Sequence, residues 1–165
     1  MIQRIQTLYL LLVVALGITL FFVPVVQLVT PENNEELRIW QLGARGLSEV
    51  TAVNESIAQL APVELKGLWG FALTTLLIPV LALIDIFLYK KRLLQARLNI
   101  FTVMLCLGYY GVLAIYIWLA RAVMGVDWHI LPWASIPLIC VILVIMATRR
   151  ILKDEALVRA ADRIR

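Results

Sequence analysis

The chain has 165 residues, of which 62% are apolar and only 16% are charged. Soluble domains usually contain about 45–50% apolar and about 25% charged residues, so this composition excludes an ordinary water-soluble globule. Fifteen Lys and Arg residues against eleven Asp and Glu residues give a net charge of +4. In so apolar a chain this charge bears on membrane orientation and not on nucleic-acid binding. We therefore expect an integral membrane protein.

Four stretches are long and apolar enough to cross a hydrocarbon core of about 30 Å, which takes roughly 20 residues of helix. They are residues 8–29, 67–89, 98–120 and 131–148. The first follows Arg4 and resembles a secretory signal, but its apolar run is too long and no small-x-small cleavage site follows it. We expect an all-α membrane protein, a single integral membrane domain over residues 1–165 built as a four-transmembrane-helix bundle.

Basic residues are distributed unevenly between the two sides of this bundle. Eleven of the fifteen lie before the first span, between the second and third spans, or in the tail. The other four lie in the segments that follow the first and the third span. Since cytoplasmic loops carry an excess of Lys and Arg, we expect both termini on the cytoplasmic side.

Residues 30–66 form an outer loop long enough to have structure or function of its own. Alternating apolar residues flank the turn-like sequence Gly43-Ala44-Arg45-Gly46, which predicts a two-stranded hairpin. A lone hairpin is marginal in water, so we expect a small, partly β outer cap on the helix ends or on a partner. Pro62 and Glu64 are placed to open a helix that runs straight into the second span.

The third loop is short and carries an indole, with further indoles before and after it. These residues are Trp118, Trp128 and Trp133. Indole rings prefer the membrane interface, where the apolar ring and the polar N–H both find suitable surroundings. The three indoles therefore predict an outer interfacial belt.

The tail, residues 149–165, is predicted to be a helical continuation of the fourth span, with Ile151, Leu157 and Val158 in a narrow apolar stripe. Two interpretations stay open. One is a solvated C-terminal cytoplasmic helix along the anionic leaflet; the other is a docking surface for a cytoplasmic partner. The candidate docking residues are Lys153, Asp154, Glu155, Arg159, Asp162 and Arg163.

Motifs for enzyme chemistry are absent from the sequence: it has no phosphate loop, dinucleotide glycine pattern, zinc-protease helix or serine elbow. Cys106 and Cys140 lie inside spans, where packing is the expected role. His129 is the only imidazole, and partners for catalysis or metal binding are not visible beside it. Tyr109 and Tyr116 share a face and are predicted to point into the bundle, each with an acceptor for its hydroxyl. We expect no catalytic residue, no metal site and no cofactor.

Asp85 is the intramembrane polar candidate, because a carboxylate at membrane depth is by default a functional hypothesis. It lies five residues before Lys90 and thus about 7 Å from the cytoplasmic end by helical rise. A structural network at that end and a proton or ion site both remain open. The partners within reach for such a network are Arg4, Tyr89, Lys90, Arg97 and Asn99.

Two further features concern how the helices pack. Pro79 interrupts the second span and frees the carbonyl of Thr75, which favours a kink. Gly108, Gly111 and Ala114 follow one another at three-residue steps and would let another helix approach closely. Both features are better evidence for helix packing than for a binding pocket.

The opening MIQRIQTLYLLL, the segment YKKRLLQARL and the ending KDEALVRAADRIR together resemble a known family. It is an uncharacterised four-span family of small bacterial inner-membrane proteins, a domain of unknown function found chiefly in Bacteroidota. The resemblance covers the whole chain, and the two termini are its specific part. It implies an inner-membrane location and four helices, and it brings no activity and no catalytic residues.

These observations predict a non-enzymatic integral inner-membrane accessory, scaffold or assembly subunit. Its partners would be the lipid bilayer and a membrane or envelope protein complex, with no nucleic acid and with homo-oligomers left open. The alternative is a small oligomeric transporter or channel that uses Asp85 and the Pro79 kink. A membrane-embedded enzyme ranks third, because the acid, base and metal groups it needs are missing.

Overall fold

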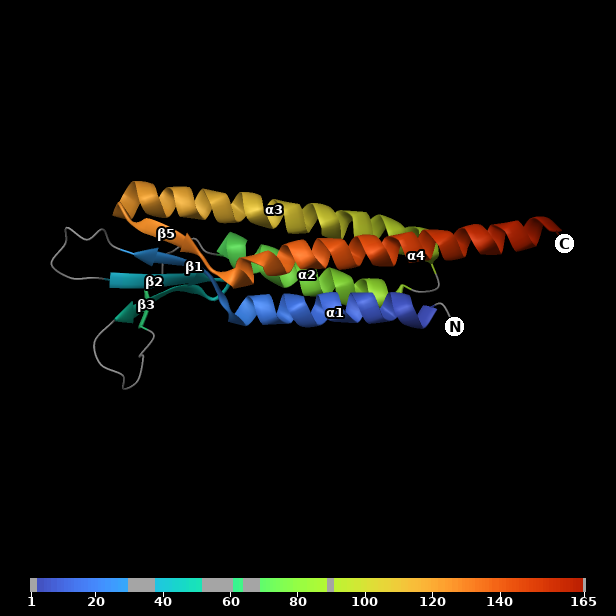
Figure 1. Ribbon diagram of the computed structural model, residues 1–165, viewed down its shortest axis with the longest axis horizontal. Coiled ribbons are helices and arrows are strands. Elements are labelled where there is room, and N and C mark those ends of the chain that lie inside the picture. The colour runs from blue at the N-terminus through green and yellow to red at the C-terminus, as the bar shows by residue number, and fades with distance from the viewer. Residues whose placement is uncertain (1–2, 30–37, 52–60, 64–68, 89–90, 165) are drawn as a thin grey trace.

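The computed structural model describes residues 3–29, 38–51, 61–63, 69–88 and 91–164. Four long helices run side by side, and a small sheet stands at one end of them, while both chain termini lie at the other (Figure 1). We call these the sheet end and the terminal end. The fold is thus mostly helical with a small β cap, as the sequence predicted.

The helices are α1 (Gln3–Phe22), α2 (Trp69–Phe87), α3 (Arg92–Met124) and α4 (Ile136–Ile164). Four segments are long and apolar enough to cross a membrane: Ile5–Phe22, Trp69–Phe87, Leu93–Ala122 and Pro132–Val158, the last of which begins just before α4. α1 packs along α2 and α4, and α3 packs along the same two helices. The four helices therefore form a ring in which α1 and α3 are diagonal.

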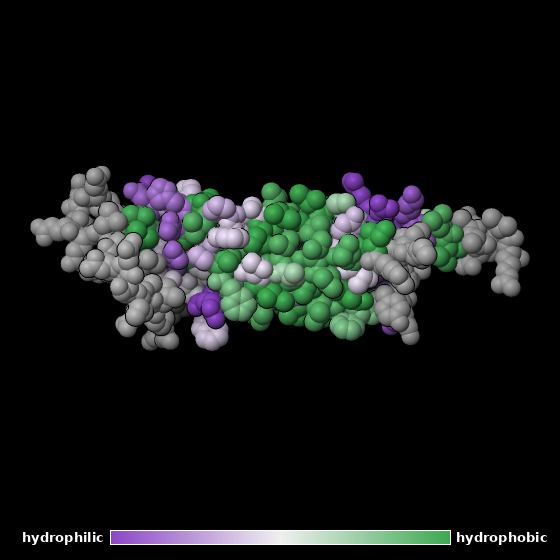
Figure 2. Space-filling view, turned by 60° about the horizontal axis from the view of Figure 1, so that its bottom comes forward, coloured by the Kyte–Doolittle hydropathy of each residue, from purple (hydrophilic) through white to green (hydrophobic). Residues whose placement is uncertain are grey.

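The outside of this ring is apolar along its middle. Large apolar side chains are exposed on every helix, among them Leu11, Leu73, Met104 and Ile142. On the face seen in Figure 2, apolar residues form a belt with hydrophilic residues at both of its ends. Exposed apolar surface of this extent is unfavourable in water and suits contact with lipid tails. The chain is a multi-pass membrane protein.

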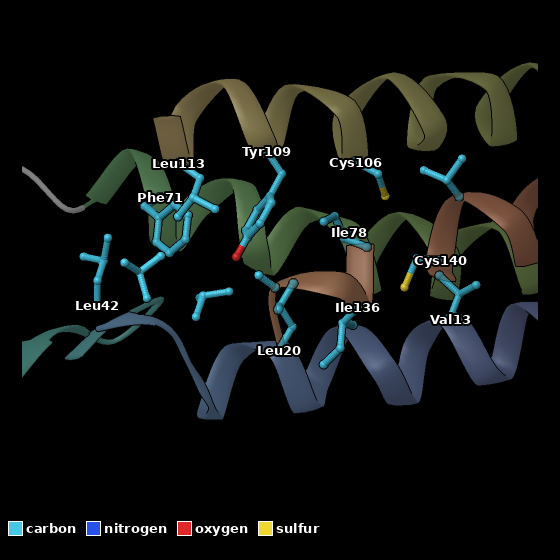
Figure 3. Packing of buried hydrophobic residues seen from close by; sticks show 14 of the residues in the cluster. Val13, Leu20, Leu42, Phe71, Ile78, Cys106, Tyr109, Leu113, Ile136 and Cys140 are labelled. Carbon is cyan, nitrogen blue, oxygen red and sulfur yellow. The ribbon is translucent and has the colours of Figure 1, made fainter. Parts of the chain in front are cut away.

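The interior is a close-packed apolar core with one stripe from each helix (Figure 3). Phe71 of α2 and Tyr109 of α3 have ring centroids 5.0 Å apart. α1 and α2 approach each other closely at Gly17, where an added Cβ would lie 2.9 Å from Cδ of Pro79. Pro79 is buried within a continuous α2, so the predicted kink position serves as a packing site for α1.

The first apolar stretch does not form a single helix over residues 8–29, so that prediction was wrong. α1 ends at Phe22 and the chain continues as strand β1 (Pro24–Val29). Pro24 lacks a backbone N–H and does not continue a helix, and the β-branched Val25 and Val26 favour extended backbone. β1 pairs with a strand on each side, which satisfies its backbone groups outside the helix.

The sheet has five strands in the order β4-β3-β2-β1-β5, and all pairs are antiparallel. The predicted hairpin is confirmed as β2 (Arg38–Gly43) and β3 (Gly46–Thr51). Gly46 has φ of 132°, which explains why glycine closes this turn. The hairpin is not alone, because β1 lies beside β2 and gives it the support that an isolated pair lacks.

Besides β1, two strands were not predicted. β4 (Ala61–Val63) contains Pro62, which was expected to open a helix into the second span, so that expectation was wrong. Pro62 is tolerated because β4 is an edge strand, where one side needs no N–H donor. β5 (Asp127–Ile130) forms the opposite edge and places His129 beside Gln27 of β1.

A glycine cap, a short helix and two hydrogen bonds fix the connection from α3 to α4. α3 has 33 residues, so it rises about 50 Å and passes the end of the hydrocarbon core beside the sheet. It ends at Gly125, whose left-handed φ of 62° suits glycine. A short 3-10 helix, η1 (Pro132–Ser135), then leads into α4. The Tyr110 hydroxyl donates to the Ala134 carbonyl at 2.8 Å and accepts from the Leu138 N–H at 3.1 Å.

Candidate functional site

The buried stripe of α3 changes character along the helix. Towards the sheet end it is formed by Cys106, Tyr109 and Leu113, whereas towards the terminal end it is formed by polar side chains. These buried polar residues are Gln95, Asn99 and Thr102. The neighbouring stripe of α2 ends in Asp85, which is also buried. Polar groups of two adjacent helices therefore lie inside the terminal third of the bundle.

A side-chain hydrogen bond fixes the register of these two helices. Gln95 Nε2 donates to the backbone carbonyl of Asp85 at 3.1 Å. The Lys91 N–H donates to the Leu88 carbonyl at 2.9 Å and the Gln95 N–H to the Lys91 carbonyl at 3.0 Å, so the turn between the helices is tight. Asp85 consequently lies at the level of Gln95, at the end of the bundle where α2 meets α3.

Helix geometry turns the side chains of Asp85 and Asn99 towards the same level. Asn99 lies one turn deeper than Gln95 on the same face of α3, at about the level of Ala82. Every Cα–Cβ bond tilts towards the N-terminus of its own helix. Because α2 and α3 are antiparallel, the carboxylate of Asp85 tilts deeper into the bundle and the amide of Asn99 tilts back towards the turn. Thr102, a further turn along, tilts in the same direction as Asn99.

The electrostatics of this cluster are unusual. The exposed fraction of Asp85 is 0%, and neither carboxylate oxygen has a hydrogen-bond partner among the described residues. The buried Asn99 Nδ2 atom is also without a partner. The Thr102 hydroxyl donates to the Leu98 carbonyl at 3.1 Å, which leaves its oxygen lone pairs available. A buried carboxylate without a compensating partner costs several kcal/mol, so this arrangement calls for a ligand or a proton.

The structural network expected around Asp85 is absent from the residues that the structure describes. Arg97 is exposed, and the Asn99 amide does not bond to the carboxylate. The side chains of Arg4, Tyr89 and Lys90 lie outside the described residues. The sequence pointed to Asp85 itself, but only the packing shows that its carboxylate is buried and has no hydrogen-bond partner in the described chain.

Gln6 adds a polar group nearer to the terminal end. It is buried on α1 with its Nε2 atom unpartnered. The contact between Gly17 of α1 and Pro79 of α2 gives a common reference level. Counted from this level towards the terminal end, Gln6 lies three turns away on α1 and Asp85 lies less than two turns away on α2. By helical rise Gln6 is therefore about 7 Å nearer to the membrane surface than Asp85. Sequence reasoning missed Gln6, since one Gln at a helix start gives no signal.

The donor chemistry excludes one class of site in the described part of the chain. No three residues of the His, Cys, Asp or Glu type come together there as a metal-binding group. The cluster instead offers one carboxylate with neutral amide and hydroxyl oxygens. Such hard oxygen donors suit cations that prefer oxygen ligands and do not suit soft transition metals.

A family model described as a domain of unknown function, DUF4293, matches residues 2–164. The chain belongs to this family. No curated protein matches it. The resemblance inferred from the termini and the segment after the second span is thereby confirmed, and four apolar helices fit a membrane family. The description of the family names no activity, so function has to be inferred from the residues of this DUF4293 chain.

The candidate docking residues of this DUF4293 member lie on the last part of α4. Lys153 is exposed, while Asp154 and Glu155 are half-buried and take part in interactions. The side chains of the other three, Arg159, Asp162 and Arg163, lie outside the described residues. All six belong to α4 beyond Thr148, so they form a surface separate in the fold from Asp85.

Four other residues that the sequence analysis named lie in the apolar core or on the edge strand β5. Cys106 and Cys140 are buried free thiols in the core. His129 is exposed on the edge strand β5, with Asp127 on the same strand. The buried Tyr109 hydroxyl has no hydrogen-bond partner in the described chain, so the prediction of an acceptor was wrong for Tyr109.

The small-residue stripe of α3 faces outward. An added Cβ at Gly108 or Gly111 would meet nothing within 4 Å, and Ala114 is exposed. No other helix in the described chain packs there. The close helix approach occurs instead at Gly17, which sequence reasoning did not single out.

An apolar cavity at the sheet end was also missed. It has a volume of about 410 Å³ and lies where α3, β5 and η1 meet. Its lining residues are Tyr110, Leu113, Ile130, Leu131, Pro132, Ala134 and Ser135. The unpredicted strand β5 supplies one wall, so nothing in the sequence could have indicated this cavity.

Proposed function

We propose that the chain is a non-enzymatic accessory or assembly subunit of a bacterial inner membrane, with its terminal end in the cytoplasm. The distribution of basic residues supports this orientation. Lys91, Arg97, Arg149, Arg150 and Lys153 are exposed at the terminal end, whereas Arg45 and Arg121 are the exposed basic residues of the described sheet end. An excess of basic residues is typical of the cytoplasmic side.

The observation that carries the proposal is the end of α4 that lies beyond the bundle. Ile151 is the last buried side chain among the described ones of this helix, yet α4 continues to Ile164 and extends past the bundle (Figure 1). Leu152, Leu157 and Val158 are exposed there. A short helix without packing is marginal in water, so a second surface is needed to stabilise it.

The charges of this extension favour a protein over the anionic leaflet as that surface. Lys153 is followed at once by Asp154 and Glu155, and one further acid, Asp162, lies among Arg159, Arg163 and Arg165. A negatively charged leaflet attracts basic residues and repels acidic ones. Exposed leucine and valine can form the apolar centre of a protein interface, and charged residues of both signs suit its polar rim.

Site-specific photo-crosslinking in native membranes tests this function. A photoreactive residue at Leu157 is expected to give one protein adduct of defined mass. The same residue at Leu107, which is exposed in the apolar belt of α3, is expected to give lipid adducts only. Lys153→Glu should weaken the Leu157 adduct, and Lys91→Glu on the same side should leave it unchanged. Lipid adducts alone at Leu157 would contradict the proposal.

A small transporter or channel is the second candidate, and the buried unpartnered carboxylate of Asp85 favours it. The described interior between Pro79 and the sheet end is nevertheless mostly apolar. The tight Gly17–Pro79 contact also leaves no room for a pathway between α1 and α2. Ion flux into proteoliposomes that is lost in Asp85→Asn would support this candidate; absence of flux in the parent protein would reject it.

A further inference from the structure

We propose that the free edge of β5 and the apolar cavity beside it bind an extended peptide segment of a second protein, which joins the sheet as a further strand. One large apolar side chain of that segment fills the cavity. Nothing in the family match assigns such a surface. The surface lies at the sheet end, whereas the α4 extension lies at the terminal end, so the proposal does not rest on the function proposed above.

β5 is the last strand of the sheet, so one of its edges has no neighbouring strand in the described chain. Natural proteins usually protect such an edge, for example with proline or lysine, because unpaired N–H and C=O groups recruit other strands. The opposite edge follows this rule, since β4 has only three residues and contains Pro62. β5 contains neither proline nor lysine, and Trp128 and Ile130 are exposed on it. β5 is therefore the edge that is open to pairing.

The hydrogen bonds between β5 and β1 show which backbone groups point to the free edge. The Leu131 N–H donates to the Val25 carbonyl at 2.9 Å and continues the antiparallel register of β5 with β1. In an antiparallel pair, residues that bond across the pair alternate with residues whose backbone groups point away from it. The backbone groups of His129 therefore face β1, whereas those of Trp128 and Ile130 face the free edge. No hydrogen bond of the described chain reaches these outward groups.

The apolar cavity lies next to this edge. Ile130 of β5 and Tyr110 of α3 both line it, so a space separates this part of β5 from α3. The hydroxyl protons of the lining are already used within the protein. The Tyr110 hydroxyl donates to the Ala134 carbonyl at 2.8 Å, and the Ser135 hydroxyl donates to the Pro132 carbonyl at 2.7 Å. The cavity therefore suits an apolar occupant.

The size of the cavity and the strand register fit one side chain of an added strand. A cavity of about 150 Å³ accommodates a benzene ring in a protein interior, so the volume of about 410 Å³ is enough for a large apolar side chain. The residue opposite Ile130 in an added strand has its side chain on the same face of the sheet as Ile130. In strand addition, backbone hydrogen bonds give affinity and pockets for side chains give specificity.

The free edge favours a peptide over two other occupants. It offers N–H and C=O groups in alternation, and an extended backbone supplies both in return. The ester and phosphate oxygens of a lipid accept hydrogen bonds but do not donate them, so the carbonyls of the edge would stay unpaired. Two copies inserted in the same orientation cannot pair their β5 strands antiparallel, because each strand points from the sheet end towards the helices (Figure 1).

Peptide selection on the full chain in lipid nanodiscs tests this surface. The probe is a displayed library of random nine-residue peptides, enriched on the parent protein and depleted on Ile130→Pro. This variant lacks the outward N–H of residue 130 but keeps the bonds to β1. Enriched peptides are expected to share one large apolar residue and to bind the parent at least tenfold more tightly than Ile130→Pro in fluorescence anisotropy. Ile130→Ala, which keeps the N–H, should bind within threefold of the parent.

N-methylation of the selected peptides tests strand pairing without altering the protein. Only every second amide of an added strand faces β5. Methylation of one alternate set should weaken binding at least tenfold, and methylation of the other set should leave it unchanged.

Further variants test the cavity and the register. Ser135→Leu narrows the cavity and should weaken binding at least tenfold, whereas the matched control Ala114→Leu, exposed on α3 away from the lining, should not. Ile130→Pro should melt close to the parent temperature. His129→Pro removes a donor to β1 and should melt earlier.

Four results would overturn the proposal. The first is that no peptide is enriched on the parent over Ile130→Pro. The second is equal binding of peptides methylated in either set, which would show apolar insertion without strand pairing. The third is a phospholipid that copurifies with the parent but not with Ser135→Leu and displaces the peptides. The fourth is a dimer in native mass spectrometry that Ile130→Pro converts to a monomer, which would assign the edge to a second copy.

Discussion

The contact between Gly17 and Pro79 allows a sharp test of how the bundle packs. A Cβ added at Gly17 would lie 2.9 Å from Cδ, 3.0 Å from Cβ and 3.2 Å from Cγ of the Pro79 ring. The ring is rigid and buried in α2, so it cannot turn away as a flexible side chain would. Gly17→Ala should therefore force α1 and α2 apart or distort one of them.

Two opposing effects set the size of the change. Overpacking a well-packed interior costs about 1–3 kcal/mol. Replacing glycine by alanine inside a helix gains about 0.5–1 kcal/mol from the lower entropy of the unfolded chain. The net expectation for Gly17→Ala is a loss of about 1–2 kcal/mol of unfolding free energy.

Reversible unfolding in mixed detergent–SDS micelles, followed by far-UV circular dichroism, measures this loss. Gly111→Ala is the matched control, because its added Cβ would meet nothing within 4 Å. It should be neutral or slightly stabilising. Pro79→Gly removes the crowding ring atoms, so the cost of Gly17→Ala should shrink towards zero in that background. Equal stability of the Gly17 and Gly111 variants, or full additivity with Pro79→Gly, would refute the packing argument.

Three further predictions concern the ends of the bundle. Tyr110→Phe removes two hydrogen bonds, one from α3 to η1 and one from α3 to α4, and should cost about 1–3 kcal/mol in the same assay. Tyr109→Phe removes a hydroxyl that has no partner in the described chain and should be neutral or stabilising. Gly125→Ala places a Cβ at φ of 62° and should cost about 1 kcal/mol, a loss that Gly108→Ala should not show. Reporter tags at the two termini should both be active in the cytoplasm; activity of either on the other face would contradict the proposed orientation.

The sequence identified the one residue that matters most in the candidate site but not its environment. Asp85 was evident, because a carboxyl group in an apolar stretch is conspicuous. The sequence offered basic neighbours as partners, yet Asp85 lies on the buried face of α2 and its carboxylate has no partner in the described chain. Which of several nearby polar groups a side chain meets depends on helix register, and a hydrogen bond from Gln95 sets that register.

The pairing of the strands, too, could be predicted from the sequence only in part. The hairpin β2–β3 was predictable because its partners are adjacent in sequence and share one turn. β5 was not, because its pairing with β1 joins Gln27 to His129 across a hundred residues. The helical prediction for residues 24–29 was wrong for that reason: their backbone hydrogen bonds go to two distant strands, which local hydropathy does not reveal.

The amino-acid sequence by itself determined that this protein lies in a membrane, that it has four membrane-crossing helices and that it forms the local hairpin. Those properties follow from the transfer free energy of contiguous apolar residues and from short-range turn geometry, which are additive along the chain. Only the tertiary structure decided the ring order of the helices, the five-stranded sheet and the isolation of the Asp85 carboxylate. These depend on pairs of groups far apart in the chain, and such contacts exist only once the helices have packed.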